Sequence, residues 1–222
     1  MAERPPKPPD REPSPRFKAR KAIRKSEAPR TLRDLARKRP NLEQWDEAWN
    51  EIRGDAPRAA AILAATFVQG AIVFALRQRF LEKPPFDIER LIEPPGPLSS
   101  FYSCIELGLA LGAYGPVIYG DLHVIRRIRN GFAHAMIPLT FDTPEVILEL
   151  DQLGYLNLVK SRPPRPITER LTPRLADFVS HGMIPSNSNR EKYTITCELL
   201  WDAILGWGGG DIRSKAVEPY LP

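Results

Sequence analysis

The stretch that decides the fold is residues 121–134, which read DLHVIRRIRNGFAH. Its branched and aromatic residues return every three or four positions: Leu122, Ile125, Ile128 and Phe132. On a helical wheel of about 100° per residue these four side chains share one arc, and Arg129 falls about 20° from Leu122. The sequence therefore predicts a helix that buries its apolar side and carries the Arg129 guanidinium partly inward with it.

The same helix contains an Arg-Asn-x-x-x-His pattern made by Arg129, Asn130 and His134. An always charged guanidinium and an imidazole that titrates near neutral pH are suited to RNA cleavage. His134 would act as general acid or base towards a ribose hydroxyl, and Arg129 would stabilise the charge that develops on the phosphate. Asn130 would orient the phosphate or the histidine. These three residues are the catalytic candidates if the protein is a ribonuclease.

A structural interpretation of the same residues stays open. Arg129 would then form a buried ion pair, with Glu106 on the neighbouring helix or with Glu89 in the connection before it, because an unpaired buried charge is costly. Asn130 would bond to backbone, and His134 would cap carbonyls or fill space. On one straight helix Arg129 and His134 are about 140° apart. A joint site would need a distortion near Gly131 or a second copy of the helix across a two-fold axis.

Helical patterns recur along the rest of the chain, separated by proline and glycine. We predict helices at residues 32–38, 42–53, 56–81, 101–111, 117–136, 145–153, 175–179 and 189–207. The helix at 101–111 should end at Gly112 or Gly115. No alternating strand pattern extends beyond a few residues. The predicted fold is all-α, a helical bundle of four to five main helices.

Residues 59–76 form an uncharged run that is long enough to raise the question of a membrane span. The run holds seven alanines and a central glutamine, and alanine adds little transfer free energy although it favours helix formation. No belt of aromatic residues flanks it. We predict a buried central helix and no membrane association.

Positive charge is concentrated at the start of the chain. Residues 1–39 hold 14 of the 32 lysines and arginines but five of the 27 acidic residues, so this segment has a net charge of +9 and the remainder −4. Prolines interleave with these cations, which predicts a disordered arm over residues 1–39, an all-α domain over 40–208 and a tail over 209–222. The arm would either bind phosphate backbones through counterion release or only keep the chain soluble. The candidate nucleic-acid contacts are Arg16, Lys18, Arg20, Lys21, Arg24 and Lys25.

The two cysteines, Cys104 and Cys197, lack metal-ligand spacing and are too few for a disulfide framework. A reducing cytoplasm is the simplest setting for them. The first ten residues are prolines and charges without an apolar segment, so we expect no secretory signal. We also expect no metal and no cofactor, because the sequence has neither a Cys/His metal pattern nor a glycine-rich phosphate loop.

Three stretches carry a resemblance to a known family: Phe101-x-x-x-Ile105-x-Leu107-x-x-Ala110-Leu111-Gly112, Asp121-Leu122-x-x-Ile125-Arg126-x-Ile128-Arg129-Asn130-x-Phe132-Ala133-His134, and Phe141-Asp142. With the helices around 58–81 and 190–205 they resemble the bacterial mannitol operon repressor family over roughly residues 55–207. That family is all-helical, has no evident helix-turn-helix and is associated with transcriptional repression. In one departure, this chain has Cys104 where the family usually has arginine. The segment 154–188 is longer than in the family.

The Arg-Asn-x-x-x-His pattern also resembles the HEPN superfamily, whose helical dimers often act as metal-independent ribonucleases. That resemblance implies Arg129 and His134 as the paired residues, with Asn130 as the adjacent polar one. Three hypotheses follow: a homodimeric regulator of the repressor type that acts through protein contacts or through arm-mediated binding of DNA or RNA, a ribonuclease of toxin or defence type, and a scaffold with a degenerate site. We favour the regulator because its resemblance spans more residues.

Overall fold

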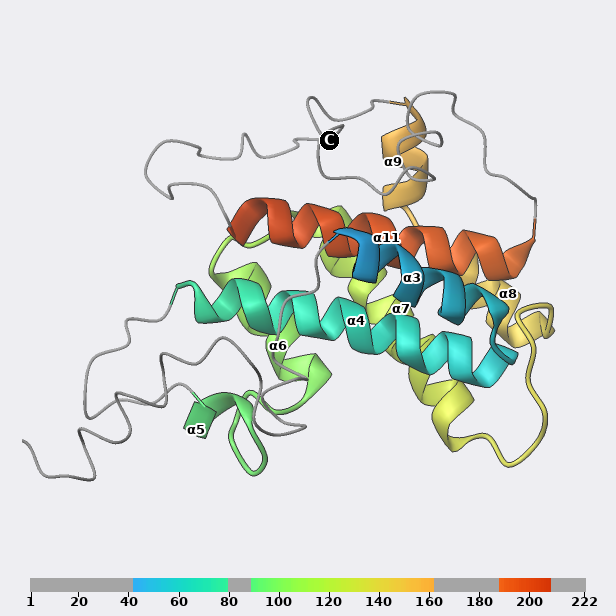
Figure 1. The fold of residues 1–222 in the computed structure, drawn as a ribbon, viewed down its shortest axis with the longest axis horizontal. Coiled ribbons are helices and arrows are strands. Elements are labelled where there is room, and N and C mark those ends of the chain that lie inside the picture. The colour runs from blue at the N-terminus through green and yellow to red at the C-terminus, as the bar shows by residue number, and fades with distance from the viewer. Residues whose placement is uncertain (1–41, 80–88, 162–187, 209–222) are drawn as a thin grey trace, which may run out of the picture. The chain divides into compact units, whose positions relative to one another are not determined.

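The computed structural model describes residues 42–79, 89–161 and 188–208 (Figure 1). These residues form helices, with no strand among them, which confirms the predicted all-α fold. The predicted arm at 1–39, the helices predicted at 32–38 and 175–179, and the tail at 209–222 lie outside the described residues. All the helices described belong to one compact unit that begins at Leu42.

Five longer helices make up most of the structure: α3 (Leu42–Gly54), α4 (Pro57–Arg77), α6 (Phe101–Ala110), α7 (Pro116–His134) and α11 (Asn189–Gly208). Three short helices accompany them: α5 (Glu89–Ile92), α8 (Pro144–Leu150) and α9 (Tyr155–Ser161). The longer helices lie close to the predicted ranges. The short helices α5 and α9 were not predicted.

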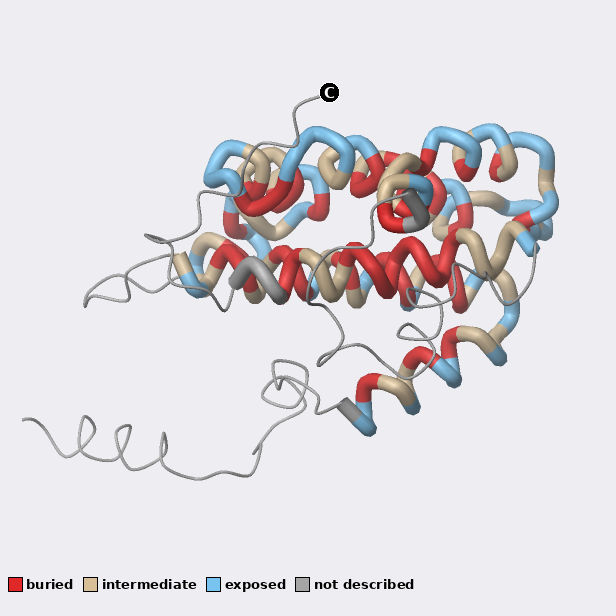
Figure 2. The backbone as a smooth tube through the Cα atoms, turned by 90° about the horizontal axis from the view of Figure 1, so that it is seen from above, coloured by how far each residue is buried: buried red, intermediate tan, exposed pale blue. Residues whose placement is uncertain are grey.

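Helix α4 is the centre of the bundle and packs against α3, α6, α7 and α11. The side chains that it buries are mostly alanines, which let the neighbouring helices approach closely: Ala60, Ala61, Ala64, Ala65, Ala71 and Ala75. Helix α11 lies alongside α4 (Figure 1), and its Tyr193 hydroxyl donates to the Ala61 carbonyl at 2.9 Å. Buried positions recur along the packed sides of the helices (Figure 2). By length and composition α4 is long enough and apolar enough to cross a membrane, and half of that stretch is buried inside the bundle.

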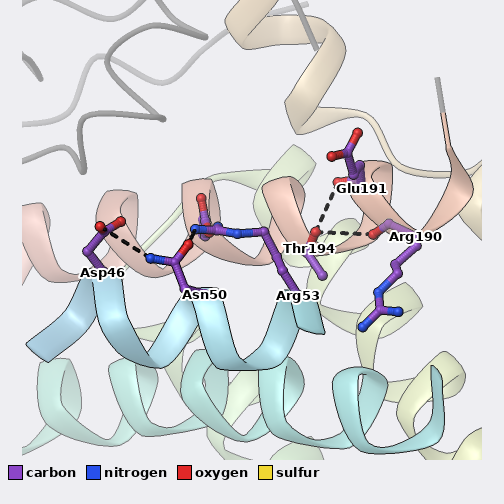
Figure 3. A network of polar contacts seen from close by, with 7 residues as sticks. Asp46, Asn50, Arg53, Arg190, Glu191 and Thr194 are labelled. Carbon is purple, nitrogen blue, oxygen red and sulfur yellow. Dashed lines mark hydrogen bonds and ion pairs between the residues drawn. The ribbon is translucent and has the colours of Figure 1, made fainter. Parts of the chain in front are cut away.

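Helix α3 is attached to α11 by polar contacts at its carboxyl end (Figure 3). Arg53 forms an ion pair with the buried Glu198 and donates to Asn50. Arg190 donates to the carbonyl of Ile52 in the last turn of α3 and to that of Asp55, the residue that follows the helix. These bonds satisfy carbonyl groups that a helix end leaves without an intrahelical partner.

The ends of α6 are set by local sequence. Ser100 precedes the helix and its hydroxyl accepts from the Ser103 amide at 3.0 Å, as a capping serine does. At the other end Gly112 has φ +66°. The Ala113 amide donates to the Gly108 carbonyl at 2.8 Å, and the Gly112 amide donates to Leu109 at 2.9 Å. This pair of bonds is a Schellman motif, and it confirms the first of the two predicted ends.

The amino terminus of α9 is capped by a carboxylate from α7. Asp121 is buried, and its two oxygens accept from the amides of Gly154 at 2.8 Å and Tyr155 at 2.9 Å. Burial raises the pKa of Asp121, while the two amide donors act in the opposite direction. An anion at a helix amino terminus also interacts favourably with the helix dipole. Asp121 therefore fixes α9 against α7 and caps a helix whose preceding residue, Gly154, has no side chain.

Candidate functional site

The inner side of α7 is formed by the apolar stripe that the sequence identifies. Leu122, Ile125, Ile128 and Phe132 are all buried. Phe132 packs against Phe141, with ring centroids 5.1 Å apart. Because this stripe fixes the rotation of the helix, it also fixes which polar residues of α7 face outward.

Arg129 is half-buried, as its position beside the apolar arc predicts. Its Nη1 donates to Oδ1 of Asn130 at 2.9 Å. The ion pair expected between Arg129 and Glu106 is not formed, and among the described residues no carboxylate contacts Arg129. Glu106 instead accepts from the Tyr119 hydroxyl at 3.0 Å, and its Oε1 lies 3.2 Å from Nε2 of His123.

The axial offset between α6 and α7 explains this difference. His123 precedes Arg129 by six residues, which is about 9 Å along a helix. Glu106 therefore reaches the first half of α7 and cannot also reach the second. The other candidate partner, Glu89, lies 3.0 Å from Nη2 of Arg77 on α4. Neither acidic residue proposed from the sequence neutralises Arg129.

Asn130 of the Arg-Asn-x-x-x-His pattern contacts Arg129 and projects towards the same side of α7 as His134. It lies four positions before His134, so the two project within about 40° of each other on adjacent turns. The Arg129 guanidinium, hydrogen-bonded to Asn130, is drawn towards this outward face although its own Cα direction is about 140° from that of His134. His134 is exposed at the last turn. Helix α7 is continuous through Gly131, so the distortion considered there is not found.

Helix α7 carries a second arginine without an acidic partner. Arg126 is half-buried, and its Cζ lies 5.4 Å from the ring centroid of Tyr102 on α6, a cation–π contact. Its Nε is buried without a hydrogen-bond partner. The adjacent Arg127 differs, because its Nη2 lies 2.8 Å from Oε2 of Glu149 on α8. Arg126 and Arg129 thus keep their charge uncompensated by any carboxylate among the described residues.

His123 lies between Arg126 and the Tyr119–Glu106 pair. Its ring is 4.5 Å from that of Tyr119 and 5.7 Å from that of Tyr102. Burial lowers the pKa of His123, and the Arg126 charge lowers it further, while Glu106 opposes both. Its Nε2 is close to Glu106 but not in hydrogen-bonding geometry. The imidazole is therefore held neutral at pH 7.

The cysteines are both buried. Cys104 donates from Sγ to the Leu98 carbonyl at 3.1 Å, and burial raises its pKa to about 11. Burial raises the pKa of Cys197 as well. Both are therefore protonated thiols at neutral pH, and neither is an activated nucleophile. In the described part of the chain no group of three His, Cys, Asp or Glu side chains is placed to hold a metal ion.

Sequence reasoning placed Arg129, Asn130 and His134 on one helix but missed Tyr102 and Arg126. The available signal was the spacing of Tyr119, His123, Arg126 and Asn130, which puts aromatic and polar residues on one side of the helix. The six arm residues, from Arg16 to Lys25, lie outside the described residues. Comparison of the chain with protein-family models, with curated proteins and with solved structures finds no match.

Proposed function

We propose that this protein is a non-enzymatic regulator of the mannitol operon repressor type that binds nucleic acid through two cationic elements, the amino-terminal arm and the outward side of α7. The observation that carries the proposal is the partial burial of Arg126 and Arg129 without a carboxylate partner in the described part of the chain. Both are half-buried, and neither has an acidic partner among the described residues. A guanidinium kept in this state is suited to bind a phosphate group.

Other half-buried arginines of the bundle have structural contacts. Arg53 and Arg77 form ion pairs, and Arg190 donates to the carbonyls of Ile52 and Asp55. The contrast supports a binding role for Arg126 and Arg129, because among the described residues neither joins two helices through a carboxylate or a backbone carbonyl. The arm would add a sequence-independent attraction to the phosphate backbone.

Protein contacts belong to the same proposal. Two large apolar side chains directly after α7, Met136 and Ile137, are exposed. The loop that carries them is held by Arg58, which donates to the carbonyls of Ala135 at 2.8 Å and Ile137 at 3.1 Å. Apolar side chains presented on a fixed loop support association with a second copy or with another protein. We propose a homodimer that binds nucleic acid.

A titration of the full-length chain with labelled DNA and RNA at several salt concentrations tests the proposal. One variant replaces the six arm cations, Arg16, Lys18, Arg20, Lys21, Arg24 and Lys25, with glutamine. Wild-type affinity should fall steeply with salt, and the arm variant should bind more weakly with a shallower salt dependence, because fewer counterions are released. Failure of the wild-type chain to bind either nucleic acid at low salt would refute the proposal.

A second candidate, a metal-independent ribonuclease, is favoured by one specific observation. The Arg129 guanidinium donates to Asn130, and Asn130 projects within about 40° of His134 on a helical wheel. This arrangement supports an anion site next to a group that can transfer a proton. Incubation of RNA with wild type, Arg129→Ala and His134→Ala, with and without a chelator, tests it. Cleavage by wild type alone supports the enzyme, and intact RNA in every reaction excludes it.

A further inference from the structure

Tyr102 presents an aromatic ring at the surface where α6 meets α7. Its side chain is 51% exposed although it is a large aromatic residue. The Arg126 guanidinium lies over this ring, and the ring of His123 is 5.7 Å away. The three side chains form a platform that is rigid on the His123 side, because His123 also packs against Tyr119.

The contacts of Tyr102 with Arg126 and His123 join α6 to α7, and they still leave 51% of Tyr102 exposed. Tyr102 is exposed, and among the described residues its polar neighbour Arg126 meets no carboxylate. Aromatic rings next to arginine serve in nucleic-acid binding proteins as surfaces on which unpaired bases stack, while the cation attracts the phosphate. A base in a duplex is already stacked and offers no free face, so the platform favours a single strand.

We propose that Tyr102 and Arg126 form a stacking subsite for one base of a single-stranded nucleic acid. The inference rests on the proposed function, since Arg126 is one of its phosphate-binding residues. Asn130 lies one turn beyond Arg126 on the same side of α7, about 6 Å along the axis, and brings the Arg129 guanidinium to that side. A strand whose base stacks on Tyr102 then passes Arg126 and Arg129.

Glu106 sets the direction of that strand. Its carboxylate lies beside His123 and Tyr119, which precede Arg126 on α7, whereas Asn130 follows Arg126. A phosphate brought next to this carboxylate would be repelled. The strand therefore runs from Tyr102 towards Asn130 and His134, away from Tyr119.

Fluorescence anisotropy on the full-length chain tests the subsite. The probes are a labelled short oligouridylate, an oligothymidylate of equal length and a duplex of equal length. Tyr102→Leu removes the ring and Tyr102→Phe keeps it. We expect Tyr102→Leu to weaken binding of the single strands by roughly 5- to 150-fold, the usual range for one stacked base. Tyr102→Phe should bind like wild type, and duplex affinity should not change.

Two readouts keep this inference separate from the proposed function. The melting temperature of Tyr102→Leu should stay close to that of wild type, because Tyr102 is 51% exposed and leucine keeps an apolar side chain at the position. If Tyr102→Leu binds single strands as wild type does, or loses duplex affinity equally, the stacking subsite is refuted while the proposed function stands. If wild type binds no probe at all, the proposed function fails. Equal losses on both single strands assign the contact to the base, and a loss on oligouridylate alone refutes stacking, because thymine would stack on the same ring.

Discussion

The Arg129 guanidinium donates from Nη1 to Oδ1 of the next residue, Asn130, at 2.9 Å. Consecutive residues of a helix project about 100° apart and do not normally face each other. The long arginine side chain therefore has to turn along the helix surface to make this bond. A neutral amide positions the guanidinium and leaves its charge intact. A carboxylate would position the guanidinium and also neutralise its charge.

The first prediction follows from that difference. Asn130→Asp places a carboxylate next to the Arg129 guanidinium, which should convert the hydrogen bond into an ion pair and reduce nucleic-acid affinity by roughly 10-fold. Asn157→Asp, an exposed position on α9, introduces the same charge elsewhere. Affinities measured by anisotropy at one fixed salt concentration check this. Equal affinities of the two variants would show that only net charge matters.

The Asp121 carboxylate leads to a prediction about stability. Asp121→Ala removes the carboxylate that accepts from the amides of Gly154 and Tyr155 in a partly buried place. We expect the free energy of unfolding to fall by about 2–4 kcal/mol, since each unsatisfied buried donor costs about 1–3 kcal/mol. The control is Asp151→Ala, which removes an exposed ion pair with Lys192 and should cost at most about 1 kcal/mol. Urea unfolding provides the measurement, and similar losses in both variants would contradict the capping role.

The lowered pKa of His123 leads to a prediction of how stability depends on pH. Burial, and then the Arg126 charge, lower the pKa of His123 in the folded protein below its ordinary value of 6.5. A histidine whose pKa is lowered by folding contributes stability above its unfolded pKa, and that contribution is lost as the pH falls through about 6.5 and below. Three charged groups surround His123: Arg126 and Arg127 lower its pKa, and Glu106 raises it.

Thermal unfolding between about pH 5 and pH 7 tests this on wild type and His123→Gln. Wild type should lose more stability than the variant on acidification, because the variant has no imidazole to protonate. His134→Gln is the comparison at an exposed histidine. Parallel curves for wild type and His123→Gln would mean that the His123 pKa is not lowered.

The close contact between Gly108 and Tyr114 leads to a prediction about substitutions in α6. An added Cβ at this position would overlap the hydroxyl of Tyr114, which donates to the Ile105 carbonyl at 2.8 Å. Gly108→Ala should displace the ring and destabilise the fold by about 1–3 kcal/mol. Gly120→Ala on α7 meets nothing within 4 Å and should stabilise by about 0.5–1 kcal/mol. Urea unfolding of both variants gives the comparison, and a stabilising Gly108→Ala would contradict the packing described.

The longer helices could be predicted because their signals are local. The apolar period of α7 and the proline and glycine residues around α4 and α6 lie within or next to the helices that they define. Helix α9 could not be predicted in the same way. Its cap is Asp121, which lies 33 residues before Gly154 in the chain. Helix α4 was predicted to extend to residue 81. In the structure it ends at Arg77, and the next two described residues are not helical.

The candidate site was predictable only in part, for a related reason. Periodicity gave the rotation of α7, and with it the half-buried position of Arg129. The partner of Glu106 depends on how far α6 is displaced along α7, which no single-helix pattern specifies. The ion pair expected for Arg129 was therefore wrong, and Glu106 contacts Tyr119 and His123. The contact between Tyr102 and Arg126 depends on the same displacement.

The most direct test of the central claim measures the salt dependence of nucleic-acid binding for Arg126→Ala/Arg129→Ala in the full-length chain. Arg90→Ala, at an exposed position on α5, is the matched control, and melting temperatures verify folding. If the α7 arginines contact phosphates, the double variant should bind more weakly and the slope of log affinity against log salt should decrease by about two. A double variant with the affinity and slope of Arg90→Ala would contradict the assignment of α7 as a phosphate-binding surface.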